Sequence, residues 1–278
     1  MEPHDLEPYD LGAHEIGRRQ ALGLGALGAL GVSLGSMLLA GDSGAVPRPT
    51  RQLLQRRLMP QMTSAPARPV SAPAPVTLWH KPARSIHDLR PDAPKNAVAL
   101  TIDDGPHPEW TPRVLDLLAK YGVKATFCLI GEQVRDNYKV VQLMVEAGHE
   151  VANHTWHHPL NINRLSPKRV EAEIVRARQV IIEVTGTSPR LFRSPGGAWS
   201  PTIFKAVARH GMLPIDWDID PRDWSRPGVS HVTRELLKGK AGDILLCHDG
   251  GGDRSQTLKS LKVVLPRLKS KGLEFITL

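Results

Sequence analysis

The distribution of apolar positions divides the chain into a first part without periodic pattern, up to about residue 95, and a regular part that follows. In the regular part, short apolar segments alternate with amphipathic ones, which is typical of strands that alternate with helices. Seven segments are expected to form strands: 97–102, 126–130, 150–152, 191–193, 213–216, 243–247 and 274–277. This alternation predicts an α/β fold of parallel strands, either an open doubly wound sheet or a barrel.

Five glycines support this division into elements. Each follows a helical pattern and comes shortly before a predicted strand, where a helix commonly ends in a residue with positive φ. They are Gly122, Gly148, Gly186, Gly211 and Gly272. Residues 96–278 are therefore expected to form one globular domain.

Polar residues that could bind a ligand or take part in catalysis gather where the predicted strands end. Ligands bind at the carboxyl ends of strands in open α/β sheets and in barrels alike. The residues concerned are Asp103 and Asp104, Asn153 and His154, Arg193, Asp216 and Asp218, and His248 and Asp249, which end five different strands. Polar turn residues are common after a strand, and this explains any one of these ends but not all five together.

Two of these ends suggest a metal site. Adjacent carboxylates such as Asp103 and Asp104 repel one another unless a cation or a proton separates their roles. His154 and His158 could join Asp104 around one metal, on a turn rather than a helix because Pro159 disfavours helix at His158. A site of two histidines and one carboxylate suits zinc in hydrolases and iron in oxygenases, so the ligands leave the metal open. The intervening histidine, at position 157, is expected to be a solvated bystander.

Five motifs in this region resemble, in order, those of the polysaccharide deacetylases, which form carbohydrate esterase family 4. The matching segments are 101–106 (TIDDGP), 154–158 (HTWHH), 193–197 (RSPGG), 220–224 (DPRDW) and 245–249 (LLCHD). The resemblance covers about residues 96–278 and favours the barrel over the open sheet. It implies a distorted (β/α) barrel of about seven parallel strands, with zinc or a similar divalent ion (cobalt, nickel or manganese) as cofactor.

The family's metal and base roles carry over to five residues. The resemblance implies that Asp104, His154 and His158 bind the metal, while Asp103 is the base that activates water and Arg193 keeps Asp103 ionised. The chemistry calls for such a set, because a metal lowers the pKa of water and a base completes its activation.

The acid and the acetyl pocket are implied in the same way. His248 would protonate the departing amine and would be oriented by Asp223, with Trp224 and Leu246 as walls of the pocket. The third motif departs from the family, which usually has tyrosine where this chain has Gly196. A backbone N–H donor for the oxyanion survives the loss of a side chain, but the aromatic wall is missing, which bears on the substrate.

Two cysteines, Cys128 and Cys247, lie within predicted strands, one in each. Each stands where an apolar residue would serve, and nothing local indicates pairing, so we expect two buried free thiols. An exported protein could still pair them.

The N-terminal part reads as an export signal and a linker. Arg18 and Arg19 precede a glycine-rich apolar run, 21–40, and small residues follow at 43–45, as in twin-arginine signals. If this segment is retained, it would be a membrane anchor. Residues 46–95 are rich in proline, arginine and alanine, which predicts a disordered, extended tether.

Charge is unevenly distributed over these regions, at −4 for residues 1–45, +7 for 46–95 and +5 for 96–278. Such a basic chain could meet nucleic acid, anionic lipid or an acidic polymer. No aromatic platform interleaves with the charges, so nucleic acid is not expected, and association with an anionic cell wall fits best. The alternative is that the excess arginine is only solvated surface.

The sequence therefore predicts three regions: an export signal at 1–45, a linker at 46–95 and a catalytic domain at 96–278. The expected activity is metal-dependent hydrolysis of N-acetyl groups from a polymeric amino sugar such as peptidoglycan or chitin, by an exported monomer. An O-acetyl esterase acting on xylan would use the same residues, and a wall-binding module with a silent site is the alternative from another class.

Overall fold

The computed structural model describes residues 78–278. The predicted export signal and the linker up to residue 77 lie outside the described residues. No helix in the described part is both long and apolar enough to cross a membrane.

A sheet of seven strands forms the centre of the domain. The strands are β1 (Ala97–Asp103), β2 (Thr126–Leu129), β3 (Glu150–Asn153), β4 (Leu191–Phe192), β5 (Leu213–Pro214), β6 (Ile244–His248) and β7 (Glu274–Ile276). All pairings are parallel, in the order β5-β4-β3-β2-β1-β6, and β7 pairs with the first residues of β1. The seven predicted strands and their parallel arrangement are confirmed.

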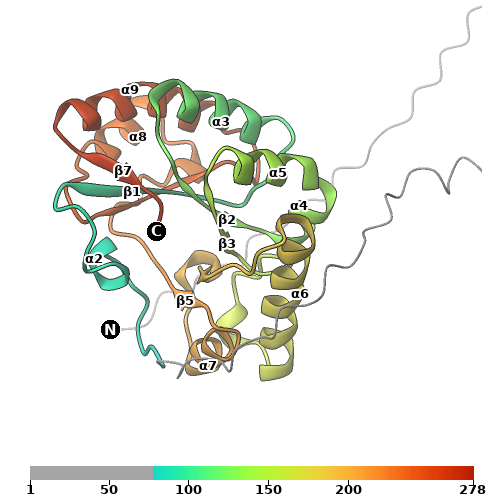
Figure 1. The fold of residues 1–278 in the computed structure, drawn as a ribbon. Helices are drawn as coiled ribbons and strands as arrows, with labels where there is room; N and C mark the ends of the chain where they lie inside the picture. The colour runs from blue at the N-terminus through green and yellow to red at the C-terminus, as the bar shows by residue number, and fades with distance from the viewer. Residues whose placement is uncertain (1–77) are drawn as a thin grey trace, which may run out of the picture. The chain divides into compact units, whose positions relative to one another are not determined.

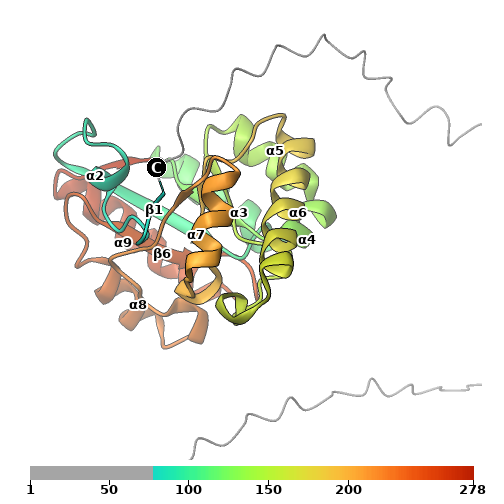
Figure 2. The same ribbon diagram turned by 90° about the horizontal axis from the view of Figure 1, so that it is seen from below.

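Helices surround this sheet. They are α2 (Ile86–Leu89), α3 (Trp110–Tyr121), α4 (Gly131–Asp136), α5 (Tyr138–Glu146), α6 (Pro167–Thr185), α7 (Pro201–Arg209), α8 (Val229–Leu236) and α9 (Ser255–Ser270), with short 3₁₀ turns η1 (Ile162–Arg164), η2 (Pro195–Gly197) and η3 (Asp223–Ser225). Figure 1 shows α3, α5, α8 and α9 along one side of the central strands. The view from below in Figure 2 has α2 and α7 in front of the strands. All five glycines predicted to follow helices have positive φ.

Alternation along β1 separates two cores. Val98, Leu100 and Ile102 pack outward in the large core that the sheet forms with α3, α5, α8 and α9. Ala97 and Ala99 face inward, where the neighbouring strands also present small or short side chains. Successive side chains of a strand point to opposite faces, so one strand serves both cores. The inward face ends in polar residues, and this is where the site is found.

The sheet closes into a distorted barrel through connections outside the strands. Strands β5 and β6 do not pair with each other, and residues 83–85 bridge them: Ala83 pairs with Ile215 and Ser85 with Asp243. Farther along, Ile219 pairs with Leu245 of β6. The resulting parallel-strand half-barrel with surrounding helices is the predicted distorted (β/α) barrel.

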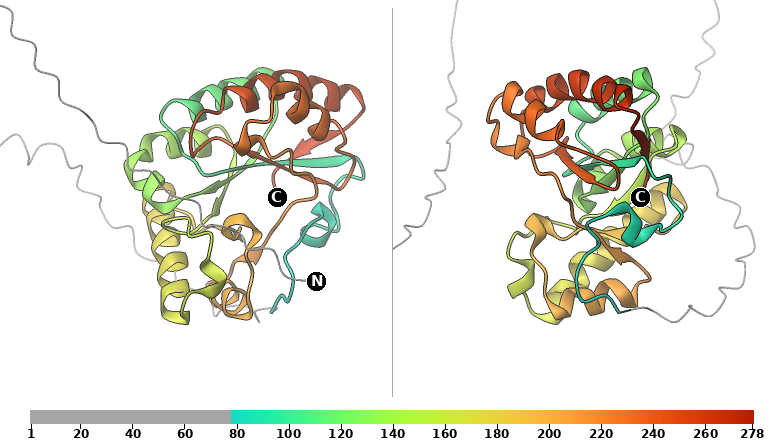
Figure 3. Two further views of the ribbon diagram at one scale, coloured as in Figure 1. Left: turned by 180° about the vertical axis from the view of Figure 1, so that it is seen from behind. Right: turned by 90° about the vertical axis from the view of Figure 1, so that its left-hand side faces the viewer.

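The folded unit begins earlier than the expected boundary at residue 96. Ala83, Ile86 and Ala93 are at most 7% exposed and join the inner core or its edge. Figure 3 shows the segment that carries α2 beside the chain around β5. The proline and arginine content of residues 46–95 hid these isolated apolar positions, which are too widely spaced to form a periodic pattern.

Candidate metal centre and catalytic site

Most of the predicted site residues lie on the inward face of the sheet, at or just after the ends of the strands. Asp103 continues the inward series of Ala97, Ala99 and Thr101 on β1, and Arg193 follows inward-facing Leu191 of β4 in the same alternation. Asp104 is the neighbour of Asp103 and would face outward if the strand continued. Its φ of 74° turns the chain, which brings the two adjacent carboxylates into one cluster.

Asp104, His154 and His158 meet as a candidate metal centre. Their possible ligand atoms all lie within 4.8 Å of one another. Nε2 of His158 is 3.3 Å and Nε2 of His154 is 3.6 Å from Oδ1 of Asp104. Oδ1 of Asp104 is buried and has no hydrogen-bond partner in the described structure. A buried carboxylate oxygen facing two imidazoles fits a divalent cation.

The second nitrogen of His154 fixes how that ring points. Nδ1 lies 2.8 Å from the carbonyl oxygen of Arg193, which can only accept a hydrogen bond. The proton therefore sits on Nδ1 and leaves Nε2 with a free lone pair toward Asp104. Metal-binding histidines commonly have their second nitrogen anchored in this way.

Protonation states suit the same role. Burial raises the pKa of Asp104, but the nearby imidazoles of His154, His158 and His248 outweigh it and hold that pKa well below its usual range. Burial lowers the pKa of His158, which favours the neutral imidazole that a metal needs.

His157 lies outside the metal cluster, as expected of a bystander, but its ring is anchored rather than merely solvated. Its side chain is half exposed, but Nδ1 lies 2.7 Å from Oε1 of Glu173 on α6. The residue does not join the metal cluster, and it belongs instead to the structure that holds the loop.

A buried ion pair joins Asp103 to Arg193. The Arg193 guanidinium is fully buried and donates to Oδ1 of Asp103 at 2.7 Å, to the hydroxyl of Thr101 at 2.8 Å and to the carbonyl of Asp216 at 2.8 Å. Burial lowers the pKa of Arg193, but the Asp103 charge outweighs it and the pKa is raised. Arg193 therefore balances the Asp103 charge and fixes the position of its carboxylate.

His248 and Asp223 form a second buried pair. Nδ1 of His248 lies 2.7 Å from Oδ1 of Asp223, and the backbone N–H of His248 donates to Oδ2 at 2.9 Å. Thr257 on α9 donates its hydroxyl to the same Oδ2 at 2.6 Å. Burial lowers the pKa of His248, but the bond with Asp223 and its charge raise that pKa to about 9. At neutral pH the imidazole is therefore a proton donor.

One cavity of about 440 Å³ gathers these groups. Its lining includes the predicted residues Asp103, Asp104, His154, His158, Gly196, Trp224, Leu246 and His248. Arg193 and Asp223 lie behind it, in contact with Asp103 and His248. Asp220, the first residue of the fourth motif, also lines the cavity, although the sequence assigned it no role. The sequence did not indicate Leu160, Trp217, Gly251 and Arg254, which lie outside the motifs and are identified as lining residues by the folded structure.

The backbone conformation at Gly196 favours glycine. Its φ is 57°, in the left-handed region that side chains rarely adopt. A Cβ there would lie 3.4 Å from Cδ2 of Leu160, which is 67% exposed at the cavity rim. A leucine thus borders the cavity beside the position where the family usually has tyrosine.

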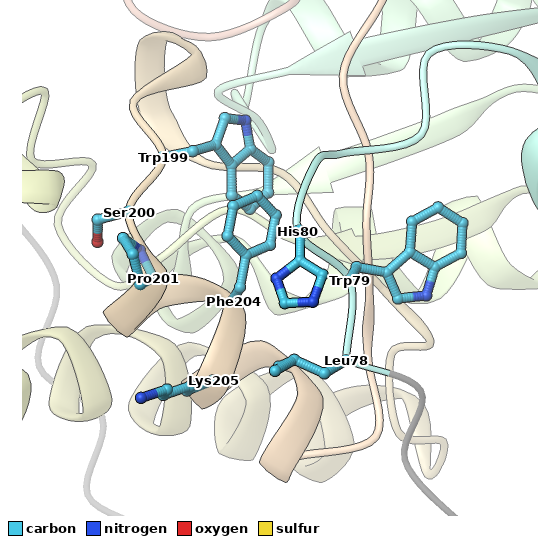
Figure 4. A pocket seen from close by; sticks show the side chains of 8 residues that line it. All are labelled: Leu78, Trp79, His80, Trp199, Ser200, Pro201, Phe204 and Lys205. Carbon is cyan, nitrogen blue, oxygen red and sulfur yellow. The ribbon is translucent and has the colours of Figure 1, made fainter.

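A smaller cavity of about 290 Å³ lies apart from this site (Figure 4). Trp199 and Phe204 stack with ring centroids 4.9 Å apart, and His80 and Leu78 lie across from them. Its lining contains no carboxylate, so it has no base comparable to Asp103. This cavity therefore lacks the groups that make up the candidate metal centre and catalytic site.

Both cysteines are buried free thiols, as predicted. Burial raises the pKa of Cys128 and of Cys247, which keeps them protonated. Cys247 packs in the outer core, while its neighbour His248 lines the cavity.

Fold and site together define an α/β-barrel protein with a candidate metal centre, a buried Asp103–Arg193 pair and a buried His248–Asp223 pair at its strand ends. The family model for polysaccharide deacetylase matches residues 90–215. A peptidoglycan-N-acetylglucosamine deacetylase of Bacillus cereus is 42% identical over 183 residues, which are 65% of this chain and 85% of the relative. A chitooligosaccharide deacetylase of Bradyrhizobium sp. is 39% identical, over 64% of this chain and 87% of the relative. The chain belongs to the polysaccharide deacetylase family.

Solved structures agree with this assignment. The crystal structure of a peptidoglycan N-acetylglucosamine deacetylase matches with a TM-score of 0.64 at 31% identity, over 66% of this chain and 86% of that chain. A CE4 family pseudoenzyme from Bacillus anthracis matches with a TM-score of 0.62 at 30% identity, over 66% of this chain and 64% of that chain. The family thus includes a protein described as a pseudoenzyme, so the fold alone does not determine activity.

Proposed function

We propose that this protein removes N-acetyl groups from a polymeric amino sugar by metal-dependent hydrolysis. The observation that carries the proposal is the joint presence, in one cavity, of the Asp104-His154-His158 cluster, a carboxylate at Asp103 and the imidazole of His248, which is paired with Asp223. Family membership indicates deacetylation, and the relatives are named for peptidoglycan and chitooligosaccharide substrates.

Asp103 is the general base in this proposal. Asp104, His154 and His158 would hold a zinc or similar divalent ion, which would act as a Lewis acid on the acetyl carbonyl and lower the pKa of a nearby water. Asp103 takes the proton from the attacking water, and the oxygen of that water forms the new bond to the acetyl carbon. Arg193 holds Asp103 in place through a 2.7 Å ion pair, so the carboxylate is positioned before substrate arrives.

His248 is the general acid. The bond between the acetyl carbon and the sugar nitrogen breaks well only when the nitrogen receives a proton, because an amide anion is a poor leaving group. His248 supplies that proton, and Asp223 orients its ring and keeps it charged. The products are acetate and the free amine of the sugar.

Substrate contacts involve the rim of the cavity. Trp224 is 46% exposed at the rim, and Leu246 lies inside, so together they form an apolar place for the acetyl methyl group. The N–H of Gly196 is assigned to the developing oxyanion. Glycine at this position adds no aromatic side chain to the wall, whereas Trp217 and Trp224 line other parts of the same cavity.

Two alternatives use the same cavity differently. An O-acetyl esterase would need the base and metal ligands but depend less on His248, because an alcohol leaves more easily than an amine. A silent wall-binding module would tolerate loss of the ligands, the acid or the base. All of these positions are filled here, which favours an enzyme.

The decisive experiment measures amine release from acetylated glucosamine oligomers with and without a chelator. We expect release by the purified protein, its loss on chelation and its recovery on addition of zinc. The variant His154→Ala should release no amine and bind less metal while remaining folded. A protein that cleaves O-acetyl xylan but not the oligomers would support the esterase, and one that binds wall polymer without any release would support the silent module.

We also propose export by the twin-arginine route, as a monomer that associates with an anionic cell wall. The proposal rests on Arg18 and Arg19 before a glycine-rich apolar run and on the excess of basic residues after it. Changing both arginines to lysine should retain the protein in the cytoplasm. Unchanged export of that variant would contradict this route.

A further inference from the structure

The loop between the two histidine ligands, residues 154–158, has an unusual backbone. Thr155 has a φ of 68° and His158 a φ of 60°, both in the left-handed region although neither residue is glycine. Such conformations persist only when surrounding contacts determine them. The loop is therefore held in its shape from outside.

Backbone contacts provide part of that hold. The N–H groups of Gly131 and Glu132, at the start of α4, donate to the carbonyls of Thr155 at 2.9 Å and Trp156 at 3.2 Å. Asn153 accepts from the N–H of Thr155 at 2.9 Å. These contacts leave the N–H groups of residues 156 and 157 to other partners.

One carboxylate of α6 binds both remaining N–H groups. Oε2 of Glu173 accepts from the N–H of Trp156 at 3.1 Å and from the N–H of His157 at 2.8 Å. Oε1 lies 2.7 Å from Nδ1 of His157. The Glu173 side chain is only 13% exposed, and hydrogen bonds to a shielded carboxylate are stronger than those between neutral groups.

The same face of α6 fixes the loop by packing. The guanidinium of Arg176, three residues after Glu173, lies 3.8 Å from the ring centroid of Trp156. The Trp156 ring is buried against Gly131. A methyl group on Gly131 would lie only 2.5 Å from Cε3 of that ring. Glu173 and Arg176 thus hold the backbone and the side chain of one loop residue.

We propose that Glu173 is a positioning residue for the metal centre, through the backbone of residues 156 and 157. The inference rests on the proposed metal site formed by Asp104, His154 and His158. Glu173 touches none of these ligands, but it fixes the turn between the two histidines. Without its carboxylate, two loop N–H groups lose their partners, and the loop relaxes toward φ values that turn His158 away from Asp104.

The test is metal affinity, measured by titrating zinc into the metal-free full-length protein. Glu173→Ala should weaken zinc binding by about 10- to 100-fold, the usual effect of losing a group that supports metal ligands. Glu173→Gln keeps the shape and one oxygen acceptor, so it should bind zinc more tightly than Glu173→Ala. Glu183→Ala is the matched control, because Glu183 lies on the same helix, is exposed and bonds only Gln179.

Amide hydrogen exchange in the metal-free proteins provides a second measurement. The N–H groups of residues 156 and 157 should exchange faster in Glu173→Ala and Glu173→Gln than in the wild type, while Glu183→Ala leaves them unchanged. If Glu173→Ala folds, wild-type zinc affinity in that variant would overturn the inference. If it unfolds, both measurements are made on Glu173→Gln, and wild-type zinc affinity in that variant would overturn the inference. A wild-type protein that binds no zinc would overturn the proposed function as well, so the two failures are distinct.

Discussion

Asp103 and Asp104 have the same side chain and adjacent positions, yet the structure gives them different surroundings. Asp103 is paired with Arg193, and Asp104 faces two imidazoles with an oxygen that has no hydrogen-bond partner. The difference arises from a single backbone angle, the φ of 74° at Asp104. Asp103, which has a guanidinium partner, keeps its position without a metal. Asp104, which lies beside two imidazoles, is suited to bind the metal.

These surroundings predict separate defects for the base and the acid. Asp103→Asn should keep zinc but lose turnover, because an amide cannot accept the proton of water. His248→Ala should also keep zinc and lose amide hydrolysis, yet retain activity on an activated acetate ester, whose leaving group departs without a proton. Each loss should be about 10²- to 10⁴-fold. Rates on both substrates, with zinc content as the control, check this.

Equal losses on the ester and the amide in both variants would contradict the division of roles. Loss of zinc from Asp103→Asn would instead place Asp103 among the ligands. The two results are distinguishable because zinc content is measured separately from turnover.

The pKa of His248 makes a prediction about pH. That pKa is raised from 6.5 to about 9, so the bond with Asp223 stabilises the fold fully below pH 6.5 and loses this effect as pH rises through 9. Activity that depends on the same proton should also fall on the alkaline side, somewhat below pH 9 because a bound cation opposes protonation.

Asp223→Asn tests this cause. Burial of His248 remains in the variant while the raising partner is lost, so the alkaline limb of kcat/KM for an N-acetyl oligomer should move to lower pH by about one to three units. The profile on an activated ester should not move. Superimposable limbs for wild type and variant would show that another group sets the alkaline limb.

Among the elements, the turn after β6 has the tightest fit to the metal centre. A Cβ on Gly250 would lie 2.0 Å from the carbonyl oxygen of Asp104, and one on Gly105 would lie 2.3 Å from Oδ1 of Asp249. The turn after β1 and the turn after β6 therefore pack closely, with Gly250 against the Asp104 backbone and Gly105 against the Asp249 carboxylate. Neither contact leaves room for a side chain.

Gly250→Ala should displace Asp104 and weaken zinc binding, with a loss of stability of about 1–3 kcal/mol from overpacking. Gly211→Ala is the control, since a Cβ there meets nothing within 4 Å but its φ is 69°. That control should lose about 1–2 kcal/mol through backbone strain and keep its zinc affinity. Zinc titration and thermal melts separate the two effects, and unchanged affinity in Gly250→Ala would contradict the packing argument.

Element identities were predictable because hydrophobic alternation and helix-ending glycines are local signals. All seven strands lie within one or two residues of their predicted bounds. The site residues at strand ends were predictable for the same reason, together with the family motifs. Glu173 and Thr257 were not, because each acts from a helix on a residue distant in sequence, and a glutamate or threonine on an amphipathic helix has no distinguishing pattern.

For the whole molecule, the least predictable feature is how the barrel closes. Strands β5 and β6 do not pair with each other, and residues 83–86 fill part of that gap with hydrogen bonds on both sides. The N–H of Ala83 donates to the carbonyl of Pro214 and the N–H of Ile86 to that of Gly242, each at 2.9 Å. Composition assigned this segment to a linker. It behaves instead as part of the domain, because a barrel can use isolated bridges that leave no periodic signature.

A protein that begins at residue 78 should therefore melt cooperatively and bind zinc like the full chain, whereas one that begins at residue 96 should lose cooperative folding because the inner core is opened.

Ile86→Ala in the full chain isolates the packing contribution: Ile86 is 0% exposed, and such a change costs about 2–5 kcal/mol. Leu78→Ala is its control, since Leu78 is 42% exposed and should change stability little. Denaturant unfolding of the four proteins measures this. If the protein that begins at residue 96 unfolds like the one that begins at residue 78, residues 78–95 are not part of the domain. The closure of the barrel then depends on the sheet and Ile219 alone.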